Sequence, residues 1–220
     1  MNQKREGQNR PKRFLKKSKP KLIAIVGGSG AGKTWLAKKL EITLGKEATR
    51  LSLDDFYRDR SHLSAKRRGQ INFDHPRAID WKFVERVLGK FAAGQSACAP
   101  KYNFATHTRA AKGEFVKPKS LIIMDGLWLL RSPAVRKFFT CRIFIDCPRS
   151  VRLRRRLKRD LKERGRNPAT IRKQFLRQVA PMHDQFVRPQ RSCANIVICN
   201  PGEVEIAHLA ETIKSMLKSN

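Results

Sequence analysis

Short apolar runs alternate with longer segments of helical periodicity along most of the chain. Five of the runs have the length and apolar content of buried strands and cover residues 22–26, 49–53, 121–124, 141–145 and 194–199. Between and after them, apolar residues recur at helical spacing, notably over residues 34–44, 81–91, 150–164, 168–187 and 203–218. This alternation predicts an α/β fold with a five-stranded parallel sheet flanked by helices. Asp54, Asp125 and Asp146 follow predicted strands, at the carboxyl edge where such sheets bind ligands.

The segment from residue 94 to 116 interrupts this alternation. It contains strand-like pieces at 97–99, 102–104 and 114–116, punctuated by Pro100 and Gly113. We interpret residues 94–116 as a β-hairpin insertion beside the main sheet.

A glycine-rich turn follows the first predicted strand. Gly27, Gly28, Ser29, Gly30, Ala31, Gly32, Lys33 and Thr34 match G-x-x-x-x-G-K-[ST] between a strand and a helix. Glycines allow backbone N–H groups to approach phosphate oxygens, and the helix N-terminus adds a positive dipole. Lys33 is expected to reach the β- and γ-phosphates, and the Thr34 hydroxyl to bind Mg²⁺. The motif predicts nucleotide binding, but alone it does not separate a kinase from an ATPase or a GTPase.

Charge adds a second feature. The 220 residues have a formal net charge of +31, concentrated in residues 4–21 and 149–177. We predict a basic, flexible tail at 1–20 and one compact domain at 21–220. The tail has two interpretations, a solubilising arm or a tether to nucleic acid or an anionic surface.

The sequence also favours a cytoplasmic protein. No run of eighteen apolar residues predicts a transmembrane segment, and no apolar signal-peptide core follows the basic N-terminus. The five cysteines lack metal-ligand spacing, as expected of reduced thiols in a cytosol-like compartment.

Beyond the phosphate loop, the chain resembles the uridine kinase (uridine–cytidine kinase) family. The resemblance rests on residues 52–57 (SLDDFY), 72–76 (NFDHP), 100–104 (PKYNF) with His107, and a basic run from Arg152 to His183. It implies a P-loop kinase fold and transfer of the γ-phosphoryl group of ATP, with GTP as an open alternative, to the 5′-hydroxyl of uridine or cytidine. It also implies Mg²⁺ and a homo-oligomer.

Phosphoryl transfer needs alignment and charge neutralisation. Lys33 and Arg159 are the catalytic cations expected here, and Asp54 is the expected base, favoured over its neighbour Asp55 because it matches the family's base. Asp125 is expected to bind Mg²⁺ together with Thr34, directly or through water. The family usually has Glu where this chain has Asp125, so the shorter side chain favours contact through water.

The resemblance also assigns residues to the nucleoside. Asp74 and Tyr57 would hold the ribose, Phe73 and Phe104 would form apolar walls, and Tyr102 and His107 would contact the pyrimidine. The family's Asp beside this tyrosine is Asn103 here, which leaves the choice of base open.

The basic run from 149 to 190 is expected to form a helical, arginine-rich lid with Gly165 as a hinge. By resemblance, Arg156, Arg159 and Arg164 would close over the phosphates, and Arg166 and Gln174 would reach the substrate. Arginine binds phosphate oxygens through a planar, permanently charged fork. Other basic residues of the run are expected to face solvent, because a helix distributes them around its axis; these are Arg154, Lys158 and Lys162.

Two alternatives remain at this point. The phosphoribulokinase, pantothenate kinase and nicotinamide riboside kinase families are similar and would change only the acceptor. A basic nucleic-acid-binding protein with a vestigial phosphate loop would explain the net charge instead.

Overall fold

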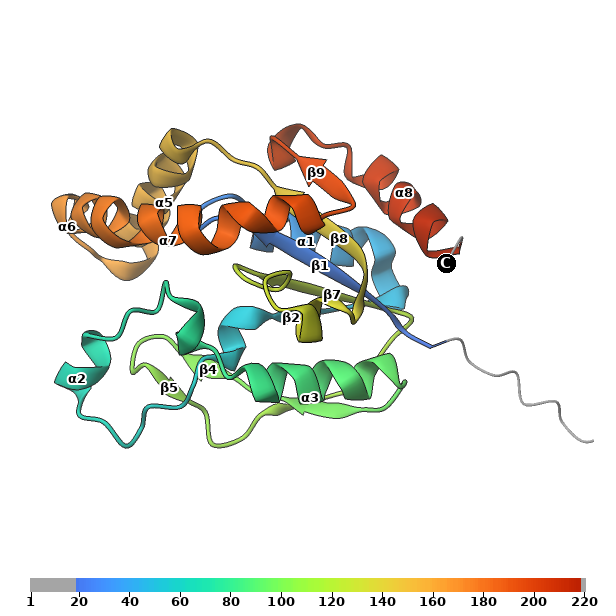
Figure 1. Ribbon diagram of the computed structural model, residues 1–220, viewed down its shortest axis with the longest axis horizontal. Helices are drawn as coiled ribbons and strands as arrows, with labels where there is room; N and C mark the ends of the chain where they lie inside the picture. The colour runs from blue at the N-terminus through green and yellow to red at the C-terminus, as the bar shows by residue number, and fades with distance from the viewer. Residues whose placement is uncertain (1–18, 219–220) are drawn as a thin grey trace, which may run out of the picture.

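A parallel sheet forms the centre of the molecule. The computed structural model describes residues 19–218, without the side chains of residues 163 and 164. The sheet has five strands in the order β2 (Ala48–Ser52), β7 (Leu121–Gly126), β1 (Lys21–Gly27), β8 (Phe139–Ile145) and β9 (Ile196–Ile198), all parallel (Figure 1). The predicted α/β fold and five-stranded sheet are confirmed. The predicted tail lies outside the described residues apart from Lys19 and Pro20.

The burial of each strand follows from its place in the sheet. β1 and β7 lie inside the sheet and are buried along almost their whole length, as their apolar sequences require. β2 is an edge strand and is only partly buried. β7 extends two residues beyond the predicted strand, so Asp125 lies inside the strand, opposite Ser52, rather than after it. β2 ends at Ser52, and Asp54 lies in the 3-10 helix η2 (Leu53–Phe56).

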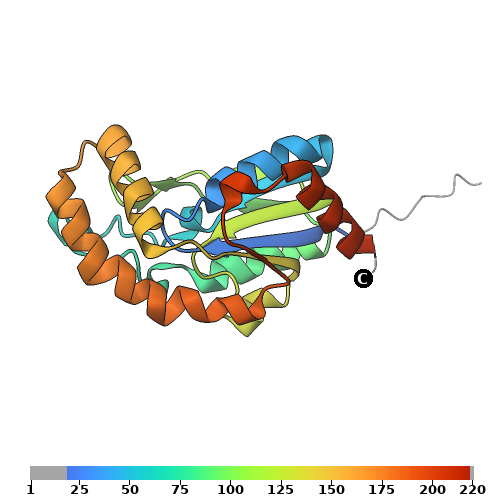
Figure 2. The ribbon, with the colours of Figure 1, turned by 90° about the horizontal axis from the view of Figure 1, so that it is seen from above.

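Helices cover both faces of the sheet. α1 (Lys33–Leu44) and α8 (Ile206–Lys218) pack together on one face, and α3 (Trp81–Ala92) with the short α4 (Pro133–Arg136) covers the other (Figure 2). α8 begins at Ile206 rather than at 203 as predicted, because Pro201–Glu203 forms the 3-10 helix η7. The phosphate loop follows β1 and η2 follows β2, so both begin at the carboxyl edge of the sheet, between the two helical layers.

The insertion differs from a simple hairpin. β3 (Ala97–Ala99) pairs with β6 (Glu114–Val116), and β4 (Tyr102–Asn103) pairs with β5 (Thr108–Arg109), both antiparallel. Asn103 closes the turn between β4 and β5, because its side-chain oxygen accepts the backbone N–H groups of Ala105 and Thr106. The insertion is therefore a long hairpin with an interruption near Pro100, and the pattern missed its short third strand.

The lid region, residues 149–190, is a run of helices beside the phosphate loop. α5 (Arg149–Arg164) ends at Gly165, which has a left-handed backbone (φ 57°). α6 (Pro168–Gln174), η4 (Phe175–Val179), α7 (Ala180–Met182) and η5 (His183–Val187) then continue as one ribbon. The predicted helix over 168–187 is wrong in detail, because η4 and η5 are π-helical turns around a segment that contains Pro181, which has no N–H to donate.

The remaining elements are short. They comprise α2 (Ala65–Gly69) and the 3-10 helices η1 (Gly45–Glu47), η3 (Pro76–Ala78) and η6 (Arg188–Cys193). Within residues 19–218, no helix combines the length and apolar character that crossing a bilayer requires.

Candidate active site

The phosphate loop joins β1 to α1. Gly30 and Gly32 have positive φ angles of 81° and 102°, and the Ala31 N–H donates to the Gly28 carbonyl. Lys33 turns back over the loop, and its ammonium donates to the same carbonyl at 3.1 Å. The loop therefore has the turn geometry and the cation that a phosphate chain requires.

Two glycines of the loop are also required by close packing, which the motif did not predict. A Cβ on Gly28 would lie 2.8 Å from both Arg152 Nη1 and His183 Nδ1, and a Cβ on Gly30 would lie 2.4 Å from the Arg152 carbonyl oxygen. The loop thus packs directly against α5 and the end of the lid region. Burial lowers the pKa of His183 to about 4, so its imidazole is neutral at pH 7. Arg152 and His183 therefore pack against Gly28, and the Arg152 backbone packs against Gly30.

Thr34 and Asp125 converge beside the loop. The Thr34 hydroxyl donates to Asp125 Oδ2 at 2.7 Å, and Asp125 is 2% exposed. A hydroxyl that donates its proton to a carboxylate leaves its own lone pairs for a cation, and oxygen ligands of this kind suit Mg²⁺. The two residues therefore fit the metal that the sequence predicts, with Thr34 as ligand and Asp125 orienting it or binding the ion through water.

Asp54 faces this cleft from η2. Burial raises its pKa from 3.8 to about 6, and the nearby Lys33 ammonium opposes part of that rise. Burial also lowers the pKa of Lys33, although Asp54 and Asp125 oppose the change. Asp55 points elsewhere, since its carboxylate accepts the Tyr102 N–H at 3.2 Å. A carboxylate with a pKa near 6 is ionised at neutral pH and basic enough to accept a proton.

A larger cavity, of about 750 Å³, adjoins the phosphate loop. All the side chains predicted to bind substrate line this one cavity: Tyr57, Phe73, Asp74, Tyr102, Phe104, His107, Arg166 and Gln174. They come from the residue after η2, the loop before η3, the insertion and the lid region.

Aromatic rings form one end of the cavity. His107 stacks on Phe73 with ring centroids 4.4 Å apart, and Tyr57 lies edge-on to Phe73 at 5.4 Å. Tyr102 contacts Phe104 at 5.4 Å. The Tyr57 hydroxyl donates to the Phe73 carbonyl, which fixes the two segments against each other. Flat apolar walls of this kind suit a planar ring.

Charged side chains form the other end. Asp74 lies 3.8 Å from the Arg156 guanidinium, and burial raises the pKa of Asp74 despite that cation. Arg156 also donates to Ser29 Oγ in the phosphate loop and to Gln174. Arg156 therefore links the loop to the acceptor cavity rather than lying in the phosphate cleft with Lys33, Thr34 and Asp125.

The other lid residues divide between the two spaces. Arg159 lines both, and its guanidinium pairs with Asp160 at 2.8 Å. Arg166 reaches Gln174 at 2.8 Å and faces the acceptor cavity. The side chain of Arg164 lies outside the described residues.

The two spaces meet at a small shared boundary. A second cavity of about 240 Å³ contains Lys33, Thr34 and Asp125, and residues common to its lining and that of the acceptor cavity are Ser29, Asp54, Leu127 and Arg159. A phosphate chain on the loop and a hydroxyl compound in the larger cavity would therefore face each other across Asp54 and Arg159.

The sequence indicated no site role for Arg152, His183 or Leu127, although the first two lie in the basic run that carries the resemblance. Arg152 and Arg156 are four residues apart on α5 and are both buried, as is Asp160 four residues further on. That spacing marks one helix face and was available in the sequence. Leu127 follows Asp125 and Gly126 in the sequence, and nothing in its residue type indicates that it borders both cavities.

Known proteins resemble the chain over most of its length. It is 36% identical over 191 residues to a uridine kinase of Alkaliphilus metalliredigens, which covers 86% of this chain and 92% of the relative. It is 37% identical over 207 residues to a uridine kinase of Leuconostoc citreum, with 92% and 99% covered.

Solved structures agree on the fold. A putative fructose transport system kinase from Silicibacter sp. TM1040 superposes with a TM-score of 0.68 at 20% identity, covering 83% of this chain and 91% of that one. A phosphoribulokinase from Rhodobacter spheroides gives 0.61 at 16%, covering 85% and 75%. At these identities the likeness shows the P-loop kinase fold and not the acceptor. The model of the Phosphoribulokinase / Uridine kinase family matches residues 22–207, and the chain belongs to that family of kinases.

Proposed function

We propose that this protein transfers the γ-phosphoryl group of ATP to the 5′-hydroxyl of uridine or cytidine. The observation that carries the proposal is the meeting of the phosphate cleft and the acceptor cavity at Asp54 and Arg159. The uridine kinases among the relatives, at 36% and 37% identity, support the choice of acceptor.

The acceptor cavity supports a nucleoside in particular. The ring-lined end formed by Phe73, His107 and Tyr102 suits a planar base, and Asp74 at the other end can accept hydrogen bonds from adjacent sugar hydroxyls. Asn103 does not compete for the base, because its side-chain oxygen closes the β4–β5 turn. The departure from the family at Asn103 therefore leaves base recognition to Tyr102 and His107.

The reaction is one displacement. The 5′-oxygen attacks the γ-phosphorus, the bond from that phosphorus to the β–γ bridging oxygen breaks, and the hydroxyl proton passes to Asp54. Lys33 and Arg159 would neutralise charge on the phosphoryl oxygens, and Arg156 would hold Ser29 of the loop in place. Thr34, with Asp125 orienting it or acting through water, would hold Mg²⁺, which would supply charge neutralisation at the phosphates.

Three further properties belong to this proposal. We propose a homo-oligomer, supported by the resemblance to the family, and a cytoplasmic location, supported by the cysteine pattern. ATP is the proposed donor, with GTP as the alternative to compare.

A panel assay tests the proposal. Purified protein with ATP and Mg²⁺ is given uridine, cytidine, nicotinamide riboside, pantothenate or ribulose 5-phosphate, and the products are identified by mass. Phosphorylation of uridine or cytidine is expected. Turnover of a non-nucleoside alone would contradict the acceptor, and turnover of none would contradict the enzyme activity.

A further inference from the structure

Asp125 is held from two sides. Its Oδ2 accepts the Thr34 hydroxyl at 2.7 Å, and its Oδ1 lies 3.4 Å from Nη1 of Arg50. The Asp125 side chain is 3% exposed, so its charge depends on the Arg50 guanidinium and the nearby Lys33 ammonium, while the Thr34 hydroxyl satisfies one oxygen. Arg50 comes from the edge strand β2, a position that the phosphate-loop motif does not include.

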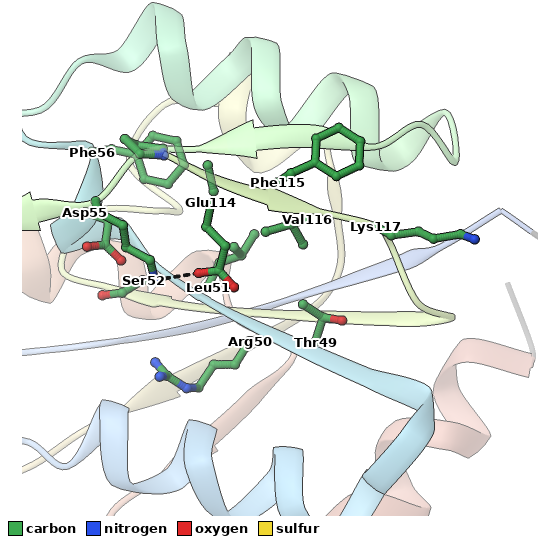
Figure 3. A pocket seen from close by; sticks show the side chains of 13 residues that line it. Thr49, Arg50, Leu51, Ser52, Asp55, Phe56, Glu114, Phe115, Val116 and Lys117 are labelled. Carbon is green, nitrogen blue, oxygen red and sulfur yellow. Dashed lines mark ion pairs between the residues drawn. The ribbon is translucent and has the colours of Figure 1, made fainter. Parts of the chain in front are cut away.

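Arg50 is itself fixed in place by α1. Its backbone N–H donates to Glu41 Oε1 at 3.1 Å, and its guanidinium Nε lies 3.4 Å from Glu41 Oε2. Figure 3 shows Arg50 pointing toward the helix side of β2, away from Glu114 and Phe115 on the opposite wall of a cavity of about 220 Å³. Glu41 thus limits the guanidinium to the side of the strand where Asp125 lies.

The carboxylate of Asp125 is on a short side chain, one methylene shorter than that of a Glu. A shorter side chain must be held more closely if it is to orient a metal ligand, since its oxygens cannot reach as far. Arg50 occupies one oxygen and leaves the other on the Thr34 hydroxyl. This division fixes both the rotamer of Asp125 and the direction of the Thr34 proton.

We propose that Arg50 is a positioning residue for the magnesium site, acting through Asp125. Residues that hydrogen-bond to metal ligands or their partners commonly set metal affinity by 10–100-fold. The inference rests on the proposed use of Mg²⁺ with ATP, and it concerns the nucleotide side alone, so it does not depend on the acceptor.

Calorimetric titration of the full-length protein with ATP, once with Mg²⁺ and once with EDTA, tests this role. Arg50→Met keeps the apolar stem and removes the guanidinium. We expect the gain in ATP affinity that Mg²⁺ provides to fall about tenfold in this variant, while ATP affinity in EDTA changes less than twofold. Glu114→Gln, on the opposite wall of the same cavity, is the matched control and should keep the full gain.

A rescue variant separates positioning from folding. In Arg50→Met, Asp125→Glu lengthens the carboxylate so that it can reach the Thr34 hydroxyl without Arg50, and the Mg²⁺-dependent gain should return to within about threefold of the wild-type value. A gain that survives in Arg50→Met overturns the proposal, and so does an equal loss of ATP affinity with and without Mg²⁺. If the wild-type protein itself shows no gain from Mg²⁺, the proposed nucleotide chemistry fails instead.

Discussion

The phosphate loop and the acceptor cavity are built in opposite ways. The loop is eight consecutive residues whose ligand-binding groups are expected to be mostly backbone N–H groups. The cavity gathers side chains from Ser29 to Gln174, supplied by the loop, η2, the insertion and the lid region. A site built from consecutive backbone groups tolerates few substitutions, and it can be identified from a short stretch of sequence. A cavity lined by side chains can change its ligand specificity through single substitutions. Nucleotide binding therefore depends on the loop, and the acceptor depends on the cavity.

Asp54, where the two regions meet, gives the largest expected effect. Asp54→Asn should lower kcat by about 1,000-fold, because a general base typically contributes 100- to 10,000-fold. ATP affinity should be unchanged. The free energy of unfolding at pH 7 should rise by about 1–2 kcal/mol, because the buried carboxylate is ionised at a cost that the amide avoids.

Asp55→Asn is the control for that variant, since Asp55 accepts the Tyr102 N–H and lies outside both active-site cavities. It should retain activity within about threefold of wild type, as expected for a change that spares the reacting groups. Near-normal kcat in Asp54→Asn would remove Asp54 as the base.

Gly30→Ala perturbs the loop alone. The new Cβ would meet the Arg152 carbonyl at 2.4 Å in a left-handed backbone, so the loop must shift. A displacement of about 1 Å at such a site commonly costs about 100-fold in rate, and we expect that loss in kcat/KM for ATP. Gly45→Ala also strains a positive-φ backbone, but nothing lies within 4 Å of the new Cβ, so it should lose about 1–3 kcal/mol of stability with normal activity. Equal activity in the two variants would contradict the role of close packing at Gly30.

Asp74→Asn perturbs the cavity alone. We expect the KM for uridine to rise about tenfold, which corresponds to one charge-assisted hydrogen bond, with the KM for ATP unchanged. Deoxynucleosides sharpen this test: wild type should discriminate against 2′- or 3′-deoxyuridine, and the variant should have lost most of that preference. Asp146→Asn is the control, since its carboxylate pairs with Arg191 outside both cavities, and it should leave both KM values unchanged. A variant that keeps full discrimination would show that Asp74 does not hold the sugar.

The pH dependence is the smallest effect. Burial raises the pKa of Asp54 to about 6, and the base must be ionised, so kcat/KM should fall as pH falls through 6. The rate at pH 6 should be about half of the plateau value, with a further decrease of about tenfold per unit below it. The contribution of Asp54 to stability changes with pH in the opposite direction to the rate. Because the pKa of Asp54 in the folded protein lies above the unfolded value of 3.8, the free energy of unfolding decreases as pH rises from about 4 to 6. A flat rate profile down to pH 5 would contradict the role of Asp54.

The sequence predicted those parts of the molecule whose cause is local. Strand and helix periodicity predicted the sheet, and the phosphate loop was contiguous and could be identified from its own residues. The resemblance to the uridine kinase family predicted which residues would line the acceptor cavity. The sequence could not predict contacts between segments that are far apart along the chain. Examples are the packing of the Arg152 backbone against Gly30 and the contact of Arg50 with Asp125. The π-helical turns around Pro181 were also beyond reach, since their apolar spacing is close to that of an α-helix.

The buried amide of Gln190 has a consequence for how the lid region can move. Its side chain donates to the Leu127 and Phe186 carbonyls and accepts the Leu130 N–H. Lifting this end from the sheet would leave the Leu127 carbonyl and the Leu130 N–H unpaired, at a cost of about 1–3 kcal/mol each. At the other end, Gly165 has no neighbour within 4 Å of its Cβ position. The C-terminal end of this helical run is therefore anchored through Gln190 to the segment that follows β7, and it is the end that costs most to move.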